Sequence, residues 1–175
     1  MLYHMEQKKN KVKLSIVYDS KFNDEQKNVR EVYIREKILQ EYLFLKNIEN
    51  DKKQIMKNKH INSIVNDCFF ENLTMNYNSN YEGIIIIDND ELFLSQKNVF
   101  WKYFDGHCFV LMCSPDENSL MASNFLNILQ NFAKPDLLES PENFSVILDA
   151  LMPSGQLMYL TQKAAHELII SHTNF

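Results

Sequence analysis

The chain has 175 residues, of which 45% are hydrophobic and 12% aromatic, and its formal net charge is −5 at pH 7. This composition is typical of a globular protein and excludes a disordered chain, and the length suggests a single domain. A nucleic-acid-binding protein usually carries a basic excess or a basic face, so the acidic balance argues against nucleic acid as a partner.

The first fifty residues carry the pattern of two strands and a helix. Residues 11–20 alternate apolar and polar side chains, as a half-buried strand does, and residues 1–7 are expected to form a weaker partner strand. Asn23 and Asp24 are suited to capping a helix. Apolar residues at helical spacing predict that helix over residues 25–46, with Glu, Lys and Arg on its other face.

The apolar periodicity fades over residues 47–80, which are rich in Asn and Lys. Such a segment buries too little apolar surface to offset the entropy of ordering it. We therefore expect a polar, partly disordered insertion with room for a short helix, inside a single domain that spans residues 1–175.

Three strands are expected after this insertion. Residues 83–88 form a buried strand, and residues 92–103 and 107–113 are expected to pair across a tight turn at Asp105-Gly106. The run 108–113 is apolar on both faces, which is typical of a strand at the centre of a sheet.

The last third of the chain predicts helices. Ser114-Pro115-Asp116-Glu117 has the order of a capping box, and Ser140-Pro141 repeats the Ser-Pro start. A further amphipathic stretch runs from about Gln162 to Ser171. The apolar stripes of the two Ser-Pro helices are Met121, Phe125, Ile128, Leu129 and Phe132, and Phe144, Ile147, Leu148 and Leu151.

Strands joined by short turns imply an antiparallel sheet, and helices before and after the strands cover its two faces. The predicted fold class is therefore α/β, in the α+β sense. It is a layered sandwich in which helices cover a mostly antiparallel five-stranded sheet.

Two motifs in the second half resemble a known family. Residues 114–121 read S-P-D-E-N-S-L-M and are followed by L-N-I-L at 126–129, and residues 146–151 read V-I-L-D-A-L and lead to Gly155. In this order they resemble the coatomer zeta chain, a longin-like small subunit of a vesicle coat. The sigma chains of clathrin-type adaptors share the layout and are the sibling alternative. The resemblance covers about residues 11–46 and 83–160.

The resemblance implies structural, non-enzymatic work. Such a chain packs on the trunk of a large coat subunit in a four-chain coat core. It reaches Golgi or vesicle membranes from the cytoplasm as part of that complex, through an Arf-type GTPase. Aromatic side chains are frequent anchors of protein interfaces, so Trp101, Tyr103 and Phe104, with the basic Lys13, are the candidate partner-interface residues.

Sigma chains also help to bind acidic dileucine signals, and here the sequence departs from the pattern. Lys13 fits the basic role in such a pocket. Asp105 and His107 stand where apolar residues are wanted, and Asp105 would repel an acidic signal. We therefore expect no dileucine binding.

Other polar residues form no recognisable catalytic or metal-binding pattern. His107 and Cys108 are neighbours on a strand and so point to opposite faces. Residues 88–91 lack the spacing and the glycine of a calcium loop, and the five histidines show no ligand spacing with the three cysteines. With three glycines in the chain, no phosphate-binding loop is present. We expect no enzyme, no cofactor and no small-molecule substrate.

A regulatory longin module that acts on small GTPases or SNARE segments is the alternative function. A SNARE itself needs a heptad helix and a tail anchor, and the chain ends at Phe175 without either. The longest apolar run, Ile84 to Ile87, is far too short to span a membrane. Three unpatterned cysteines favour a reducing, cytosolic compartment.

Overall fold

The structure is a computed structural model, and it describes residues 2–6, 11–16, 24–62, 80–88, 92–104, 107–132, 140–158 and 160–173. The strands are β1 (Leu2–Glu6), β2 (Lys11–Ile16), β3 (Tyr81–Ile87), β4 (Lys97–Phe104) and β5 (His107–Cys113). The helices are α1 (Asp24–Asn62), α2 (Ser119–Phe132), α4 (Pro141–Leu151) and α5 (Gln162–Thr173), with a 3-10 turn η1 (Pro153–Gly155) between the last two.

The five strands form one antiparallel sheet in the order β2-β1-β5-β4-β3. This confirms the predicted five-stranded antiparallel sheet. The apolar run 108–113 lies at its centre, as predicted, because β5 has β1 on one side and β4 on the other. β4 and β5 pair with Phe104 opposite His107; the predicted turn at Asp105-Gly106 lies outside the described residues.

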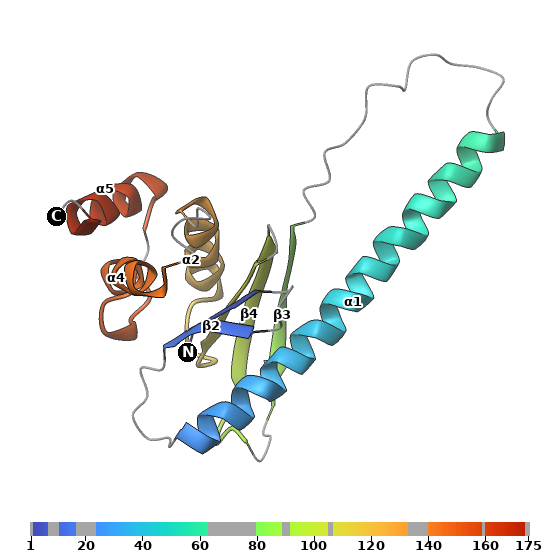
Figure 1. The fold of residues 1–175 in the computed structure, drawn as a ribbon. Coiled ribbons are helices and arrows are strands. Elements are labelled where there is room, and N and C mark those ends of the chain that lie inside the picture. The colour runs from blue at the N-terminus through green and yellow to red at the C-terminus, as the bar shows by residue number, and fades with distance from the viewer. Residues whose placement is uncertain are drawn as a thin grey trace.

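Helices cover both faces of the sheet, which confirms the predicted sandwich (Figure 1). α1 lies on one face, and α2, α4 and α5 lie on the other. Successive strand residues point to opposite faces, so each strand contributes to two cores. The core under α1 takes its sheet residues from Val99, Trp101, Cys108 and Val110, and the core under α2 and α4 takes Phe100, Phe104, Phe109, Leu111 and Cys113.

The first helix is longer than predicted. α1 has 39 residues and continues through residues 47–62, where the sequence analysis placed the start of a polar insertion. No glycine or proline interrupts residues 24–62. At 1.5 Å per residue the helix is about 58 Å long, and its C-terminal part projects beyond the sheet (Figure 1). A projecting turn has no core to face, so it loses the apolar periodicity without ceasing to be helical.

The rest of the predicted insertion, residues 63–79, lies outside the described residues. The assignment of residues 1–175 to one domain remains a prediction.

The start of α2 also differs from the prediction. Ser114 does not cap it; instead its carbonyl accepts a bond of 3.1 Å from the Glu117 amide, which closes a turn around Pro115. The capping residue is Asn118, whose Oδ1 accepts the amides of Leu120 at 2.9 Å and Met121 at 3.3 Å. A side-chain oxygen four residues closer to the apolar stripe satisfies the first amides of the helix better.

The later helices confirm their predictions. α4 begins after Ser140 with Pro141 in its first turn, although the Ser140 side chain makes no capping bond. Its four predicted stripe residues, Phe144, Ile147, Leu148 and Leu151, are all buried. α5 covers the predicted amphipathic stretch and ends two residues later, at Thr173.

One polar contact ties α1 to the edge of the sheet. Lys53 Nζ lies 2.6 Å from Glu49 Oε1, and the Tyr81 hydroxyl donates to the same carboxylate. Hydrogen bonds from Lys53 and from Tyr81 hold the pKa of Glu49 below its usual value. A carboxyl group with a lowered pKa stabilises the folded chain above its unfolded pKa, about 4.3, and this stabilisation is lost as the pH falls through the folded value.

Replacement of Glu49 by glutamine is therefore expected to lower the urea midpoint of unfolding at pH 7. The difference from wild type should shrink as the pH falls below about 4, because the wild-type carboxyl is then protonated too. Urea titrations followed by far-UV circular dichroism at several pH values measure this. The same substitution at the exposed Glu36 is the control, and a Glu49 effect that persists undiminished at pH 3 would contradict the linkage.

Candidate functional site

In the structure Trp101 and Phe104 are buried and Tyr103 is partly buried, and the three lie on two different faces of the sheet. Trp101 is 1% exposed under α1, and its Nε1 donates to Glu41 Oε2 at 2.9 Å. Tyr103 lies on the same face against Tyr42, with ring centroids 4.9 Å apart. Phe104 faces the other core and stacks on Phe109, with centroids 5.0 Å apart.

These three rings therefore do not form one surface. Lys13 lies in β2, next to the outer edge of the sheet, and its side chain is not among those described. The role of the four residues as partner contacts remains a prediction. An anchor for a partner must be accessible in the free chain, and the buried Trp101 and Phe104 do not meet this condition.

An apolar surface lies on the outer side of α1. The buried side of this helix is formed by Ile34, Ile38 and Tyr42. The prediction that Glu, Lys and Arg fill the other side is wrong. Five large apolar side chains there are 42–63% exposed, and we call them the outer α1 face: Val29, Val32, Leu39, Leu43 and Phe44.

The spacing of these residues explains why they share one side. At about 100° per residue, Val32, Leu39 and Leu43 lie within about 40° of one another around the helix axis, and Val29 lies beside them. Their side of the helix is roughly opposite Ile38, which points to the sheet. The heptad-like spacing 32, 39, 43 was the signal in the sequence that could have revealed this second stripe.

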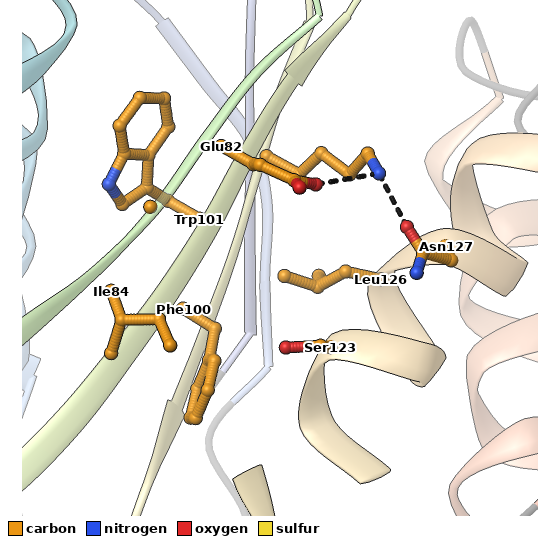
Figure 2. A pocket seen from close by; sticks show the side chains of 9 residues that line it. Glu82, Ile84, Phe100, Trp101, Ser123, Leu126 and Asn127 are labelled. Carbon is orange, nitrogen blue, oxygen red and sulfur yellow. Dashed lines mark hydrogen bonds and ion pairs between the residues drawn. The ribbon is translucent and has the colours of Figure 1, made fainter. Parts of the chain in front are cut away.

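A second surface lies between β3 and α2, on the face of the sheet opposite to α1. A cavity of about 240 Å³ opens there, which we call the β3–α2 groove (Figure 2). Phe100 and Leu126 form much of its apolar wall. The groove is lined by Glu82, Gly83, Ile84, Phe100, Trp101, Lys102, Ser123, Leu126 and Asn127.

Lys102 is the positively charged residue that lines this groove. It is 8% exposed, in a position on β4 that faces α2. Its Nζ lies 2.9 Å from Glu82 Oε2 and donates to Asn127 Oδ1, as the dashed lines in Figure 2 show. A buried ammonium group needs such partners, because an unpaired charge away from water is costly. The ion pair therefore joins the edge strand β3 to α2 through β4.

The described cysteines are not nucleophiles at neutral pH. Burial raises the pKa of Cys108 to about 12 and that of Cys113 to about 11. A thiol attacks as its thiolate, which these two groups form only in strongly basic solution. In the described parts of the chain, no cluster of three His, Cys, Asp or Glu side chains is placed to hold a metal ion.

Within the described ranges, none of the helices combines the length and apolar character required to cross a bilayer. Comparison with known proteins identifies the family of the chain. The family model for AP-5 complex subunit sigma-1 matches residues 1–169. None of the curated protein sequences matches the chain.

This match extends from β1 into α5 and so covers the sheet and the helices on both of its faces. It supports the sigma-type alternative of the sequence analysis and not the coatomer zeta chain that was favoured there. The resemblance at residues 114–129 and 146–155 identified the class of small chain without separating the zeta type from the sigma type. The chain belongs to the AP-5 complex subunit sigma-1 family.

Proposed function

We propose that this chain is the non-enzymatic small subunit of an AP-5-type adaptor complex, and that it docks on a larger subunit through the outer α1 face. The family name supplies the class of assembly, since a sigma subunit works as part of a complex. The single observation that carries the docking surface is the row of exposed apolar side chains on α1.

The outer α1 face has the character of an interface. Scattered exposed apolar residues are common on monomers, but a contiguous patch usually marks a binding surface. Here five large side chains lie on one side of a helix whose opposite side is already packed on the sheet. The polar Glu36 and Gln40 lie among them, which matches an apolar interface centre with polar groups around it.

The position of α1 in the sandwich makes this face accessible to a large partner. Among the described elements, α1 is the only helix on its side of the sheet, and α2, α4 and α5 lie on the far side (Figure 1). A partner can therefore lie along several turns of α1 without displacing another helix. Recruitment to a Golgi or vesicle membrane through an Arf-type GTPase is a further part of the proposal and rests on the resemblance alone.

Paired substitutions on α1 test the proposal. Tagged full-length chain is expressed in its own cells, and the proteins recovered with it are identified and quantified by mass spectrometry. Wild type is expected to recover a large adaptor subunit. Leu39→Asp combined with Leu43→Asp should reduce that recovery at least tenfold, because the centre of an interface tolerates a buried charge poorly.

Leu94→Asp is the matched control, since Leu94 is 84% exposed and lies off the outer α1 face. It should leave the recovery unchanged. Leu94→Asp should retain the wild-type melting temperature and the double variant should melt within about 4 °C of it, because each exposed substitution changes stability by about 0.5 kcal/mol or less. Undiminished recovery with the double variant would reject this docking face. Recovery of a small GTPase or a SNARE without any adaptor subunit would favour the regulatory longin module instead.

A further inference from the structure

β3 is the edge strand at one end of the described sheet. It pairs with β4 along its whole length, from Tyr81 opposite Tyr103 to Ile87 opposite Lys97. Natural proteins protect exposed edges with charged side chains, above all lysine, with proline or with a β-bulge. The sequence of β3, Y-E-G-I-I-I-I, contains no lysine or proline, its one charged residue is Glu82, and its register with β4 is unbroken. Its outer backbone groups are suited to pairing with another strand.

One face of this edge strand is largely exposed, contrary to the buried strand predicted at residues 83–88. The α1 side of β3 contributes Ile85 and Ile87 to a packed core. On the other side α2 packs over β4 and β5, and Ile84 and Ile86 are 52% and 61% exposed. Ile84 also lines the β3–α2 groove. An added strand could therefore gain apolar contact as well as backbone hydrogen bonds.

The charged residues at this edge determine which strand could pair with it. In strand alternation, Glu82, Ile84, Ile86 and Asp88 share one face, so two apolar residues lie between two carboxylates. Glu82 holds Lys102 with one oxygen, yet its side chain is 67% exposed, and Asp88 is exposed as well. Opposite charges on neighbouring strands stabilise a sheet, whereas like charges directly opposed destabilise it.

A second copy of the chain fits this edge poorly. Antiparallel pairing of β3 with itself would use all seven residues when centred on Ile84. That register sets Glu82 of one copy opposite Ile86 of the other and next to its Asp88. Each end of the paired strands would bring two carboxylates close together, one from each copy, which disfavours self-association.

We propose that the exposed edge of β3, with the adjoining groove, binds an extended segment of another polypeptide in which two alternating apolar residues lie between two basic ones. Written as a strand, the pattern is basic-x-apolar-x-apolar-x-basic. The basic residues lie beside Glu82 and Asp88, and the apolar residues lie beside Ile84 and Ile86. Backbone pairing supplies affinity and the alternate side chains supply specificity. The pattern is symmetric, so it fits either strand direction.

A peptide titration tests the charge pattern. Fluorescein-labelled Lys-Thr-Val-Thr-Val-Thr-Lys is titrated with the full 175-residue chain and followed by fluorescence anisotropy. Saturable binding is expected, and the same peptide with glutamates in place of the lysines should bind at least tenfold more weakly. No saturation with the basic peptide, or equal binding of the acidic one, would overturn the proposal.

Variants of the chain locate the site. Ile86→Thr keeps a β-branched residue but removes apolar contact, and it should weaken binding about tenfold. Leu94→Thr is the matched control and should bind as wild type does. Asp88→Lys should make the chain prefer a peptide with one lysine and one glutamate end. Wild-type affinity of the Ile86→Thr chain, with its circular dichroism spectrum unchanged, would place the peptide elsewhere.

Backbone methylation distinguishes strand pairing from contact with the face alone. Every second amide of an added strand points to β3. N-methylation of these amides should abolish binding, and N-methylation of the intervening amides should not. Unchanged binding of both methylated peptides would overturn edge pairing. A dimer of the free chain in size-exclusion chromatography with light scattering would make the occupant a second copy. The Leu39→Asp, Leu43→Asp double variant should still bind the peptide, so this inference and the proposed function fail separately.

Discussion

Replacing Trp101 with alanine is expected to lower the free energy of unfolding by about 3–5 kcal/mol, the usual cost of removing a large buried aromatic side chain. Trp101 is among the largest fully buried side chains of the protein. It packs in the core under α1 with Ile34, Ile38 and Val110. Its loss would also leave the partly buried carboxylate of Glu41 without the indole donor that lies 2.9 Å away.

Urea unfolding of wild type and variant, followed by circular dichroism, measures this loss. Trp101→Phe is the matched variant, because it keeps an aromatic ring and removes the indole N–H; its cost should be smaller, about 1–3 kcal/mol. The experiment also tests Trp101 as a partner anchor. If Trp101→Ala unfolds at the wild-type urea concentration but no longer recovers the large subunit, the residue acts at the interface and not in the core.

A side chain at Gly83 is the second change with a large expected effect. Gly83 lies opposite Trp101 in the β3–β4 pairing, on the side of the sheet that faces α1. A Cβ atom built there would lie 2.7 Å from Trp101 Nε1, 2.9 Å from Trp101 Cε2 and 3.0 Å from Glu41 Oε1. The indole ring is enclosed and cannot withdraw, so the added atom forces the ring or the strand to move.

Gly83→Ala is therefore expected to destabilise the fold by about 1–3 kcal/mol. Alanine is normally preferred to glycine inside a strand, by about 0.5–1 kcal/mol, so the sign of the effect identifies the clash. A double-mutant cycle isolates it. In the Trp101→Ala background the indole is gone, and Gly83→Ala should become neutral or stabilising. Additive losses in the double variant would show that the glycine is needed for another reason.

Much of the fold follows from local patterns. The apolar run of β5 indicated a central strand, and the stripes of α2 and α4 indicated buried helix faces, because residue periodicity reports which sides of an element avoid water. The Ser-Pro start of α4 was located correctly for the same local reason. At α2 a similar signal misled, since the helix begins four residues later, where Asn118 accepts the amides of Leu120 and Met121.

The binding surfaces depended on contacts between distant parts of the chain. Ile84, Lys102 and Asn127 line one groove only because β3 pairs with β4 in a given register and α2 packs across β4. Trp101 was predicted as a partner contact, but α1 covers it, and the side of α1 that was predicted to be charged carries exposed leucines. Periodicity shows which side chains are apolar and in which direction they project from their helix or strand. Whether they project toward the sheet, water or a partner is decided by long-range packing.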